Sequence, residues 1–353
     1  MNGDFSEFHD ELRAVARDVL TKTSPGPVDW QLLAASGWSG LEVPEDLGGA
    51  GATFAEVAVI LHEMGRSAAA SAYLGSVVLG VGALNLAAPG ELRDGLLQRV
   101  ATGAVRAAVA LPTGDDGITA FRLDRSESGP VLTGSASFVP DADEAEVLLV
   151  LAPDPESGPV LVEVNPAAEG VAVSPQPLVD VTRRFAQVSL DGVSIDDTAV
   201  WRFAGDPDVA VATLLDRGAL AVACDSLGLA EAMLEATVDY AKVRHQFGRP
   251  IGSFQAVKHG CANMLVQVEV CRALVSAAVQ QLVDGDASIP VSMAKSYTGA
   301  AAVDVVGEAM QLHGGIGYTW ESGVHAYLKR ALLNRSLFGS PAAHRRRLAR
   351  RYP

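Results

Sequence analysis

The sequence is short of aromatic residues, cysteine and positive charge, and each shortage excludes a class of protein. Phe, Trp and Tyr make up only 6% of its 353 residues, whereas hydrophobic residues reach 49%. The core must therefore consist mainly of small aliphatic side chains, which suit closely packed helices. The formal net charge of -15 disfavours a nucleic-acid-binding protein, which is normally basic, and disfavours adhesion to anionic lipids.

The three cysteines, Cys224, Cys261 and Cys271, form no Cys-x-x-Cys pair. The sequence therefore offers neither a zinc site nor a redox-active thiol pair, and we expect no bound metal. The N-terminus lacks a basic segment followed by an apolar one, and no apolar run approaches the ~18 residues of a membrane helix. We expect a protein of the reducing cytoplasm, with neither a nucleic-acid nor a membrane partner.

Hydrophobic periodicity divides the chain into a helical part, a β part and a second helical part. In the first part, Thr53 and Glu56 form a capping-box pattern at a helix start. In the middle part, short apolar runs alternate with turn clusters, and Asp191-Gly192 is a strong turn signal. The last part has long helical periods. Its clearest apolar seam, typical of a helical bundle, comprises Val257, Cys261, Met264, Val268, Cys271, Val275, Ala278 and Leu282.

Two segments of the second helical part carry residue types that suit a dinucleotide. The first runs from Arg244 through Phe247 and Gly248 to Gln255, and a guanidinium fork matches phosphate oxygens. The second is Gln311-Leu312-His313-Gly314-Gly315, in which glycine lets the backbone approach a ligand closely. Taken alone, such an arginine is more often a helix-end cation, and paired glycines often end a helix.

Together with the glycine-rich loop over 37–51 and a segment over 336–345, these segments resemble the acyl-CoA dehydrogenase family along nearly the whole chain. The resemblance implies FAD as the cofactor, an acyl-CoA substrate and an electron-transfer-flavoprotein-like acceptor. It also implies an oligomer, homomeric or heteromeric and arranged as a dimer of dimers, because these segments reach across a subunit interface to FAD. The cofactor-binding residues that it implies are Arg244, Phe247, Gln255, Gln311, Gly314, Gly315 and Ser340.

The resemblance also locates the catalytic base of the family and shows that it is altered in this chain. Phe338 stands where the family commonly has the glutamate that removes the α-proton, and Ser340 keeps the neighbouring hydroxyl position. Some family members carry the base on the long helix after the β part, where this chain has Asp216-Arg217. Asp216 is therefore the candidate base. The competing interpretation is an acidic residue near a helix start with a local ion pair.

The two flavin-contacting segments of the family are also altered. One reads Leu111-Pro112-Thr113-Gly114-Asp115-Asp116-Gly117 here, and the other reads Phe138-Val139-Pro140-Asp141. Phe138 keeps an aromatic residue. Pro140 replaces a hydroxyl residue and has no backbone N–H to donate.

The predicted fold is α+β and mainly α: an N-terminal helical domain over 1–105, a middle antiparallel β-domain over 106–205 and a C-terminal four-helix bundle over 206–353 that carries the FAD-binding and oligomer-forming motifs. The expected function is FAD-dependent α,β-dehydrogenation of an acyl-CoA thioester, by this chain alone or within a heteromeric enzyme of the steroid-side-chain type. Two alternatives stay open: a non-catalytic subunit that completes a partner's FAD site, and a redox-inactive acyl-CoA-binding protein.

Overall fold

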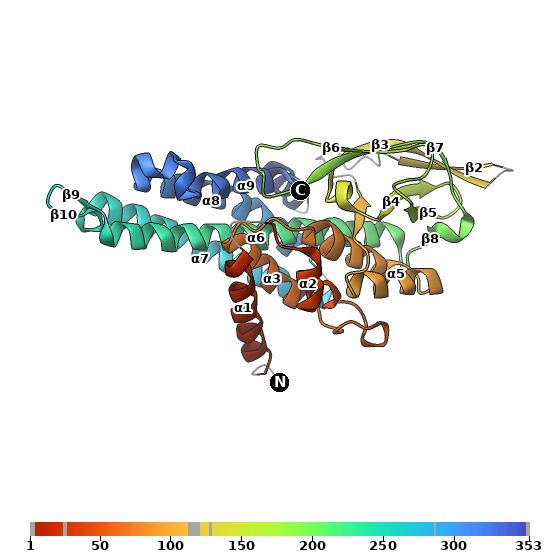
Figure 1. The fold of residues 1–353 in the computed structure, drawn as a ribbon, viewed down its shortest axis with the longest axis horizontal. Helices are drawn as coiled ribbons and strands as arrows, with labels where there is room; N and C mark the ends of the chain where they lie inside the picture. The colour runs from red at the N-terminus through yellow and green to blue at the C-terminus, as the bar shows by residue number, and fades with distance from the viewer. Residues whose placement is uncertain (1–3, 24–26, 112–120, 127–128, 286, 351–353) are drawn as a thin grey trace. The chain divides into compact units, whose positions relative to one another are not determined.

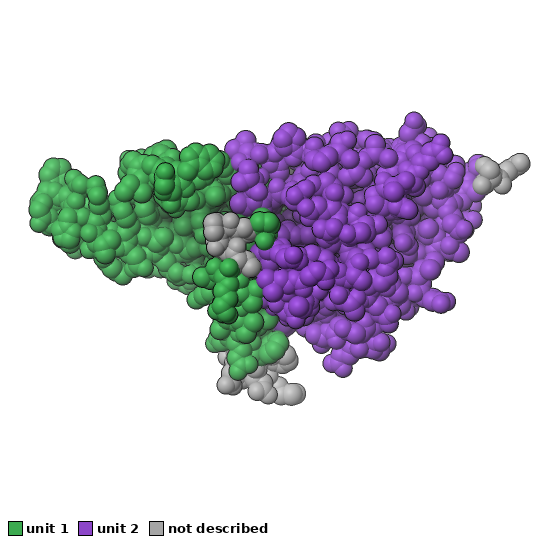
Figure 2. Space-filling view, viewed as in Figure 1, with its two compact units in different colours: residues 1–27, 58–70, 219–353 green, residues 28–57, 71–218 purple. Residues whose placement is uncertain are grey.

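The computed structural model describes residues 4–23, 27–111, 121–126, 129–285 and 287–350. Its element order confirms the predicted fold class, because helices precede and follow a β-sheet part (Figure 1). Contacts gather the chain into two compact units, coloured separately in Figure 2. Unit 1 comprises residues 1–27, 58–70 and 219–353, and unit 2 comprises residues 28–57 and 71–218. The domain boundaries at 105/106 and 205/206 stay a prediction, since the units are defined by contacts rather than by position along the chain.

Unit 2 contains short helices and a fully buried π-helix. The short helices are α2 (Trp30–Ala35), η1 (Trp38–Gly40), η2 (Glu45–Leu47), α4 (Gly82–Leu86), α5 (Glu91–Ala101), η4 (Ala142–Glu144) and η5 (Asp197–Ala199). All eight residues of the π-helix η3 (Leu74–Val81) are buried. Glycine is required at its start, because a Cβ on Gly75 would lie 2.7 Å from the carbonyl oxygen of Pro140. A π-helix is rare and is frequently found at a functional site.

The sheets of unit 2 enclose an aliphatic core. One sheet has the order β1 (Ala107–Ala110), β4 (Val147–Asp154), β5 (Gly158–Val164), β8 (Val200–Trp201), and its β1–β4 pair is parallel. The other has the antiparallel order β2 (Phe121–Ser126), β3 (Gly129–Pro140), β7 (Phe185–Ser194), β6 (Val171–Pro175). Side chains of both sheets, among them Leu132, Val150 and Val188, share one core.

The prediction of a turn at Asp191-Gly192 is wrong. Strand β7 continues through both residues to Ser194. The register between β3 and β7 shifts there, since Leu132 pairs with Val193 and Gly134 pairs with Leu190. Gly192 adopts a φ of 64°, which a β-bulge accommodates inside a strand. The same residue types therefore produce a bulge here instead of a hairpin turn.

Unit 1 is helical. Its elements are α1 (Asp4–Thr23), α7 (Gln255–Asp284), α8 (Ser288–His313), η7 (Gly314–Tyr318), η8 (Trp320–Ser322), α9 (Val324–Ser336) and α10 (Pro341–Ala349), together with most of α3 (Phe54–Arg66) and α6 (Pro207–Val243). Between α6 and α7 lie the two-residue strands β9 (His245–Gln246) and β10 (Arg249–Pro250) and the turn η6 (Ile251–Ser253). The expected capping box is present at the start of α3, where the backbone N–H of Thr53 donates to Glu56 at 2.8 Å.

The apolar seam predicted for α7 is confirmed in the middle of the helix, where Met264, Val268, Cys271, Val275 and Ala278 are buried. The ends of the seam are less covered. Length and apolar composition alone would allow α7 to cross a membrane. The same properties belong to a bundle helix, and α7 packs along α8.

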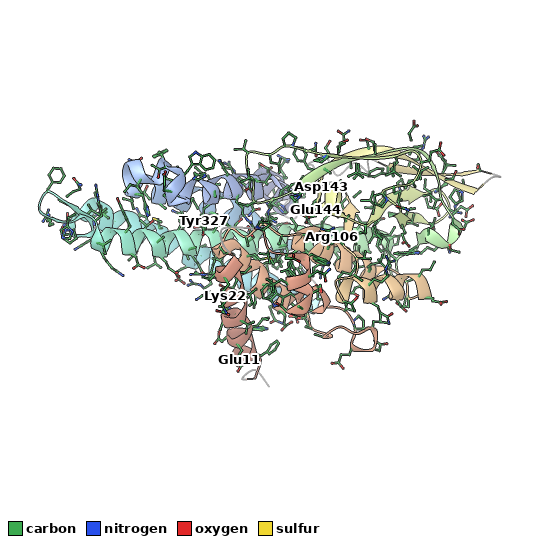
Figure 3. All side chains as sticks on the ribbon, in the orientation of Figure 1. Glu11, Lys22, Arg106, Asp143, Glu144 and Tyr327 are labelled. Carbon is green, nitrogen blue, oxygen red and sulfur yellow. The ribbon has the colours of Figure 1, made fainter. Side chains whose placement is uncertain are left out.

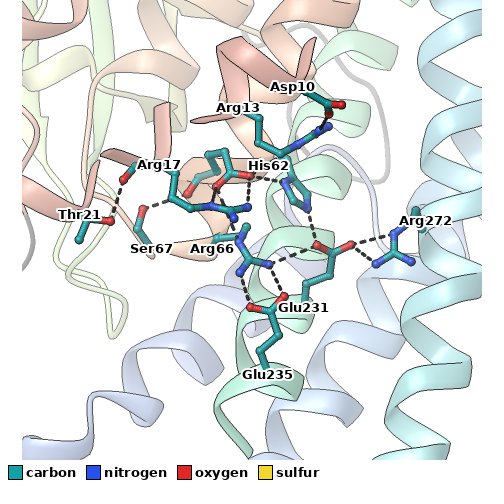
Figure 4. A network of polar contacts seen from close by, with 11 residues as sticks. Asp10, Arg13, Arg17, Thr21, His62, Arg66, Ser67, Glu231, Glu235 and Arg272 are labelled. Atoms are coloured by element: carbon teal, nitrogen blue, oxygen red, sulfur yellow. Dashed lines mark hydrogen bonds and ion pairs between the residues drawn. The ribbon is translucent and has the colours of Figure 1, made fainter. Parts of the chain in front are cut away.

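A network of charged residues ties four helices of unit 1 together (Figure 4). His62 of α3 lies between two carboxylates, with Nε2 at 2.9 Å from Glu231 of α6 and Nδ1 at 3.2 Å from Glu63. Arg17 of α1 binds Glu63, and Arg272 of α7 binds Glu231. Burial alone lowers the pKa of His62, but the hydrogen bonds to Glu231 and Glu63 outweigh it and raise that pKa.

Candidate functional site

The candidate site residues fall into three groups. Six of them, Arg244, Phe247, Gln255, Gln311, Gly314 and Gly315, lie in unit 1 around the ends of α6, α7 and α8. Ser340 also belongs to unit 1, in the turn between α9 and α10. Asp216 belongs to unit 2, within the first part of α6.

The β9–β10 hairpin presents an exposed aromatic ring at the end of α6. Arg244 directly follows this helix, and its carbonyl oxygen accepts from the N–H of Ile251 at 2.7 Å, which closes the hairpin. The reversal uses positive φ at Phe247 (52°) and Gly248 (76°). Phe247 is 91% exposed, and its ring meets that of Phe254 edge-on with centroids 6.1 Å apart. A large apolar ring held outward on a strained turn indicates a surface that another molecule covers.

The end of α8 lies beside this hairpin, at the end of the bundle where Figure 1 labels β9 and β10. The ring of Tyr240, one turn before the end of α6, stacks on His313 with centroids 4.5 Å apart, and its hydroxyl donates to the His313 carbonyl at 3.4 Å. Gln311 is exposed on the same turn. A Cβ added to Gly314 or Gly315 would meet no atom within 4 Å, so the backbone there is open to a ligand.

These bundle-end residues fit one half of an FAD site. The Arg244 guanidinium suits the pyrophosphate. The exposed Phe247 ring offers an apolar face, the amides of Gln255 and Gln311 supply polar contacts, and the bare backbone of 314–315 allows close approach. The described residues contain no group of three His, Cys, Asp or Glu that could hold a metal ion.

Backbone strain is found in the same segments that the sequence analysis assigned to cofactor or substrate. Among the described residues, five other than glycine have positive φ, and four of them are Phe138, Asp141, Phe247 and Phe338. Such conformations cost of order 1–3 kcal/mol each and persist where the surroundings impose them, often at functional sites. All four lie in segments that the sequence singles out for cofactor or substrate.

Ser340 is remote from the bundle end within one chain. Its Oγ accepts from the N–H of Ala343 at 3.2 Å and caps α10. The turn before it is contacted by Lys295 of α8, through the carbonyl of Gly339. Lys295 and Gln311 are 16 residues apart on α8, which is about 24 Å along a helix. One chain therefore offers the Ser340 turn and the bundle end as separate surfaces.

Asp216 lies deep in unit 2 and not near a helix start. Because α6 begins at Pro207, Asp216 is more than two turns inside the helix, and the dipole interpretation of this residue is wrong. Asp216 is 4% exposed. A buried carboxylate on a rigid helix suits a base that must be held in one direction.

Arg217 pairs with a residue that is distant in the sequence. Its guanidinium forms two hydrogen bonds to Glu42, at 3.0 and 2.5 Å, and lies 4.9 Å from the centre of the Phe54 ring. Glycine at position 82 makes room, because a Cβ there would lie 2.5 Å from the Nε of Arg217. The partly buried Arg217–Glu42 pair fixes the rotation of α6 next to Asp216. Sequence analysis missed Glu42, since nothing local to position 42 indicates a partner 175 residues away.

Phe138, Val139 and Pro140 form the irregular end of strand β3, and Asp141 begins the turn that follows it. The N–H of Phe138 donates to the side chain of Gln176 at 2.6 Å, and Pro140 has no N–H. This segment therefore offers few backbone donors to a ligand. Residues Pro112–Gly117 of the other predicted flavin segment lie outside the described residues.

Ion pairs support this turn from the following helix η4. Arg106 binds Glu144 at 3.3 Å, and Arg184 binds Glu144 at 2.9 Å and also pairs with Asp143. Figure 3 labels Arg106, Asp143 and Glu144. Asp141 itself accepts from the N–H of Gly75, at 2.8 Å, and so joins the turn to the π-helix η3.

Replacing Asp141 with Asn should remove a pH-dependent instability. Burial raises the pKa of Asp141 to about 7, although the Gly75 hydrogen bond lowers it. The folded protein thus keeps a proton that the unfolded chain releases near pH ~4, so stability falls as pH rises from about 4 to about 7. Asp141→Asn keeps an acceptor for Gly75. We expect its free energy of unfolding, relative to that of wild type, to increase by about 1–3 kcal/mol when the pH is raised from 4 to 8. Urea unfolding at both pH values, with fixed protein and FAD concentrations, measures this gain.

The control for Asp141→Asn is a variant of opposite sign. Arg125 lowers the pKa of Asp154 to about 2, so Asp154 contributes stability that is lost as pH falls towards that value. Asp154→Asn should therefore lose more stability at pH 8 than at pH 3. If the stability of Asp141→Asn runs parallel to that of wild type at all pH values, the assignment of a raised pKa to Asp141 is wrong.

Comparison with known proteins gives one consistent result. Family models described as the N-terminal and C-terminal domains of acyl-CoA dehydrogenase match residues 6–104 and 208–352. The chain is 30% identical over 343 residues to acyl-CoA dehydrogenase IpdE2 of Mycolicibacterium smegmatis, covering 97% of this chain and 93% of that protein. Its fold is similar to the ChsE4-ChsE5 complex from Mycobacterium tuberculosis, with a TM-score of 0.88, 28% identity and coverage of 97% and 96%. It is also similar to a variant of the Tcur3481-Tcur3483 steroid ACAD, with a TM-score of 0.86, 29% identity and coverage of 98% and 97%.

Proposed function

Since this chain belongs to the acyl-CoA dehydrogenase family, we propose that it takes part in α,β-dehydrogenation of an acyl-CoA thioester as one subunit of an oligomeric enzyme. The cofactor is FAD. When bound, FAD would accept the β-hydrogen of the substrate as a hydride. The observation that carries the proposal is the open bundle end of unit 1, where Arg244, the exposed Phe247 and the bare backbone at 314–315 offer a dinucleotide-binding surface.

In this proposal the bundle-end residues hold FAD across a subunit interface. Arg244 donates to the pyrophosphate, Gln255 and Gln311 add polar contacts, and Phe247 packs on the cofactor and thereby loses its exposure to water. The bundle-end residues and the turn over 337–340 lie at separate places on the same chain. Each chain therefore contributes its bundle end to one FAD site and its turn to another site. An assembly of at least two chains follows, and a dimer of dimers is our proposal for it.

The chemical role of this chain's own residues is proton transfer and polarisation of the thioester. An oxygen of the Asp216 carboxylate accepts the α-proton, since Phe338 has no ionisable group at the other base position. The backbone N–H of Phe338 donates to the thioester carbonyl, which stabilises the negative charge that develops on that oxygen. Loss of the glutamate side chain leaves this N–H in place.

Two relatives support a heteromeric assembly of the steroid-side-chain type. The ChsE4-ChsE5 and Tcur3481-Tcur3483 structures are each named for two chains. The altered segment at Phe138–Pro140 also supports a heteromeric assembly. The N–H of Phe138 already donates to Gln176, and Pro140 has no N–H, so neither offers a backbone donor to a flavin ring. In such an enzyme this chain completes FAD sites with a partner, and an electron-transfer-flavoprotein-like protein serves as acceptor. Retention of the whole bundle-end surface disfavours a redox-inactive acyl-CoA-binding protein.

The proposal is tested by replacing Arg244 with Ala in whichever assembly holds FAD. We expect FAD binding to weaken by about 1.5–3 kcal/mol, because one charged hydrogen-bonding partner of the pyrophosphate is lost. Flavin absorbance of the purified assembly and titration of the apoprotein with FAD measure the change. Reduction of the retained flavin on addition of acyl-CoA then tests the reaction itself.

The matched control is Lys242→Ala, which removes a cation two residues earlier. Lys242 is exposed and pairs with Asp239 at 2.9 Å, so its loss tests the general effect of charge at this end of α6. A specific site requires a large effect for Arg244 and a small one for Lys242. Unchanged FAD affinity in Arg244→Ala would contradict the proposed site.

A further inference from the structure

The turn between α9 and α10 is held from inside the bundle by a buried lysine. Lys295 of α8 is 1% exposed. Its Nζ donates to the carbonyl oxygens of Asn334 at 3.0 Å, Arg335 at 3.1 Å and Gly339 at 3.0 Å. An ammonium group has three N–H donors, so each can be directed to a carbonyl. The positive charge also lies at the C-terminus of α9, where the helix dipole favours it.

A buried histidine holds the same turn from the other helix. The Nε2 of His344, on α10, lies 2.9 Å from the carbonyl oxygen of Phe338. Because a carbonyl oxygen only accepts, Nε2 must carry the hydrogen. The Nδ1 of His344 lies 3.3 Å from the hydroxyl of Ser292, one turn before Lys295 on α8. The turn is thus anchored to α8 twice, directly by Lys295 and through His344.

These anchors explain the strained backbone at Phe338. Its φ is 53°, and that of Gly339 is 91°. A non-glycine residue keeps positive φ only where its surroundings impose it. The peptide that carries the Phe338 N–H has fixed neighbours on both sides, because the Leu337 N–H donates to Leu333 at 3.2 Å and the Phe338 carbonyl is held by His344.

The anchors of the turn therefore constrain the direction of the Phe338 N–H. Among the residues that the structure describes, no hydrogen-bond acceptor is recorded for this N–H. The Phe338 side chain is itself buried, with 6% of the residue exposed. The turn is strained and held from two sides, although the Phe338 side chain on it has no proton-transfer chemistry.

We propose that Lys295 and His344 are positioning residues, which hold the turn so that the backbone N–H of Phe338 donates to the thioester carbonyl of the acyl-CoA. The inference rests on the proposed function and adds to it the two residues that aim the donor. It assigns the turn a role through its backbone. Neither Lys295 nor His344 touches the substrate.

The test uses two ligands that differ only at the carbonyl: acetyl-CoA and its thioether analogue S-ethyl-CoA. Acetyl-CoA has no β-carbon, so it cannot be dehydrogenated and its binding to the FAD-loaded assembly is measurable by calorimetry. The wild type should bind acetyl-CoA more tightly than S-ethyl-CoA. His344→Leu, which removes the anchor of the Phe338 carbonyl, should reduce this preference by about 2- to 10-fold, the worth of one hydrogen bond. Its affinity for S-ethyl-CoA should stay unchanged.

Two further variants make the result specific. His344→Gln retains a side-chain N–H donor for the Phe338 carbonyl and should keep most of the preference. Lys295→Met should lose it like His344→Leu, and if Lys295→Met does not fold, the two His344 variants carry the test alone. Equal losses for both ligands in His344→Leu would indicate a purely structural role and overturn the inference, as would a wild-type ratio in that variant.

The failure of this inference is distinguishable from failure of the proposed function. An assembly that holds FAD, is reduced by acyl-CoA and shows a wild-type ligand ratio in folded His344→Leu disproves only the positioning role. A wild-type assembly that binds neither ligand, or binds them equally, disproves the carbonyl contact and the inference together.

Discussion

Replacing Asp216 with Asn should lower acyl-CoA-dependent turnover by about 10²–10⁴-fold, the usual cost of losing a general base, while FAD stays bound. Asn has nearly the same shape as Asp and cannot accept the α-proton at neutral pH. Asp216 is buried within α6, and the Arg217–Glu42 pair beside it fixes that helix. The substitution therefore removes the base with little change in packing. Turnover is measured with an artificial electron acceptor across a panel of acyl-CoA thioesters, with flavin content determined in parallel.

Asp208→Asn provides the matched control for Asp216→Asn. Asp208 lies in the first turn of the same helix and is exposed, so it tests the loss of one carboxylate on α6 without loss of the candidate base. Only Asp216→Asn should be impaired. If Asp216→Asn keeps wild-type turnover while an acidic residue of a partner chain proves essential, this chain is the supporting subunit and the base belongs to the partner.

Features that depend on nearby residues could be predicted from the sequence. The capping box of Thr53 and Glu56 involves residues three apart: the Thr53 N–H donates to Glu56, and the Thr53 hydroxyl accepts from the N–H of Ala55. The seam of α7 repeats with helical spacing, and its middle is buried as expected. Periodicity works in these cases because the burial of each residue follows from its position on one regular helix.

Features that depend on distant partners could not be predicted in this way. The Asp191-Gly192 pair has the composition of a hairpin turn, but pairing of β7 with β3 and β6 keeps both residues within a strand. Arg217 looks like the partner of its neighbour Asp216, yet its recorded ion pair is with Glu42. Strand register and the choice of an ion-pair partner are tertiary properties, and adjacent residues on a helix point in different directions.

Lys295 holds the turn over 337–340, and the sequence analysis did not predict this role. It lies within an apolar stretch of α8, where Val291, Ala294 and Ala301 are also buried. A lysine inside such a stretch indicates a buried cation that must find acceptors, since lysine is almost never fully buried without partners. That signal was present in the sequence. Its meaning required the position of the turn over 337–340, which only the tertiary structure supplies.

The largest expected effect on stability concerns the buried ion pair of Asp225 and Arg330. Asp225 of α6 is fully buried and accepts from the Arg330 guanidinium of α9 at 3.0 and 2.5 Å and from the Asn334 side chain at 2.6 Å. Arg330 also donates to the Ala69 carbonyl at 2.7 Å. Removing one partner leaves the other charge in the bundle interior, which costs about 3–5 kcal/mol. We expect Asp225→Asn to lower the free energy of unfolding by this amount.

The double variant Asp225→Leu/Arg330→Met distinguishes the charge from the packing. With neither charge left in the interior, the double variant should be more stable than the summed effects of the two single substitutions predict, because apolar residues of similar volume replace the pair. The exposed pair of Arg122 and Asp124 is the control, and Arg122→Ala should change stability by less than about 0.5 kcal/mol. Denaturant unfolding at fixed FAD and protein concentrations measures five variants: Asp225→Asn, Asp225→Leu, Arg330→Met, the double variant and Arg122→Ala. A loss below about 1 kcal/mol in Asp225→Asn would show that its Arg330 contact is solvated, and additive effects in the double variant would show that the two charges do not depend on each other.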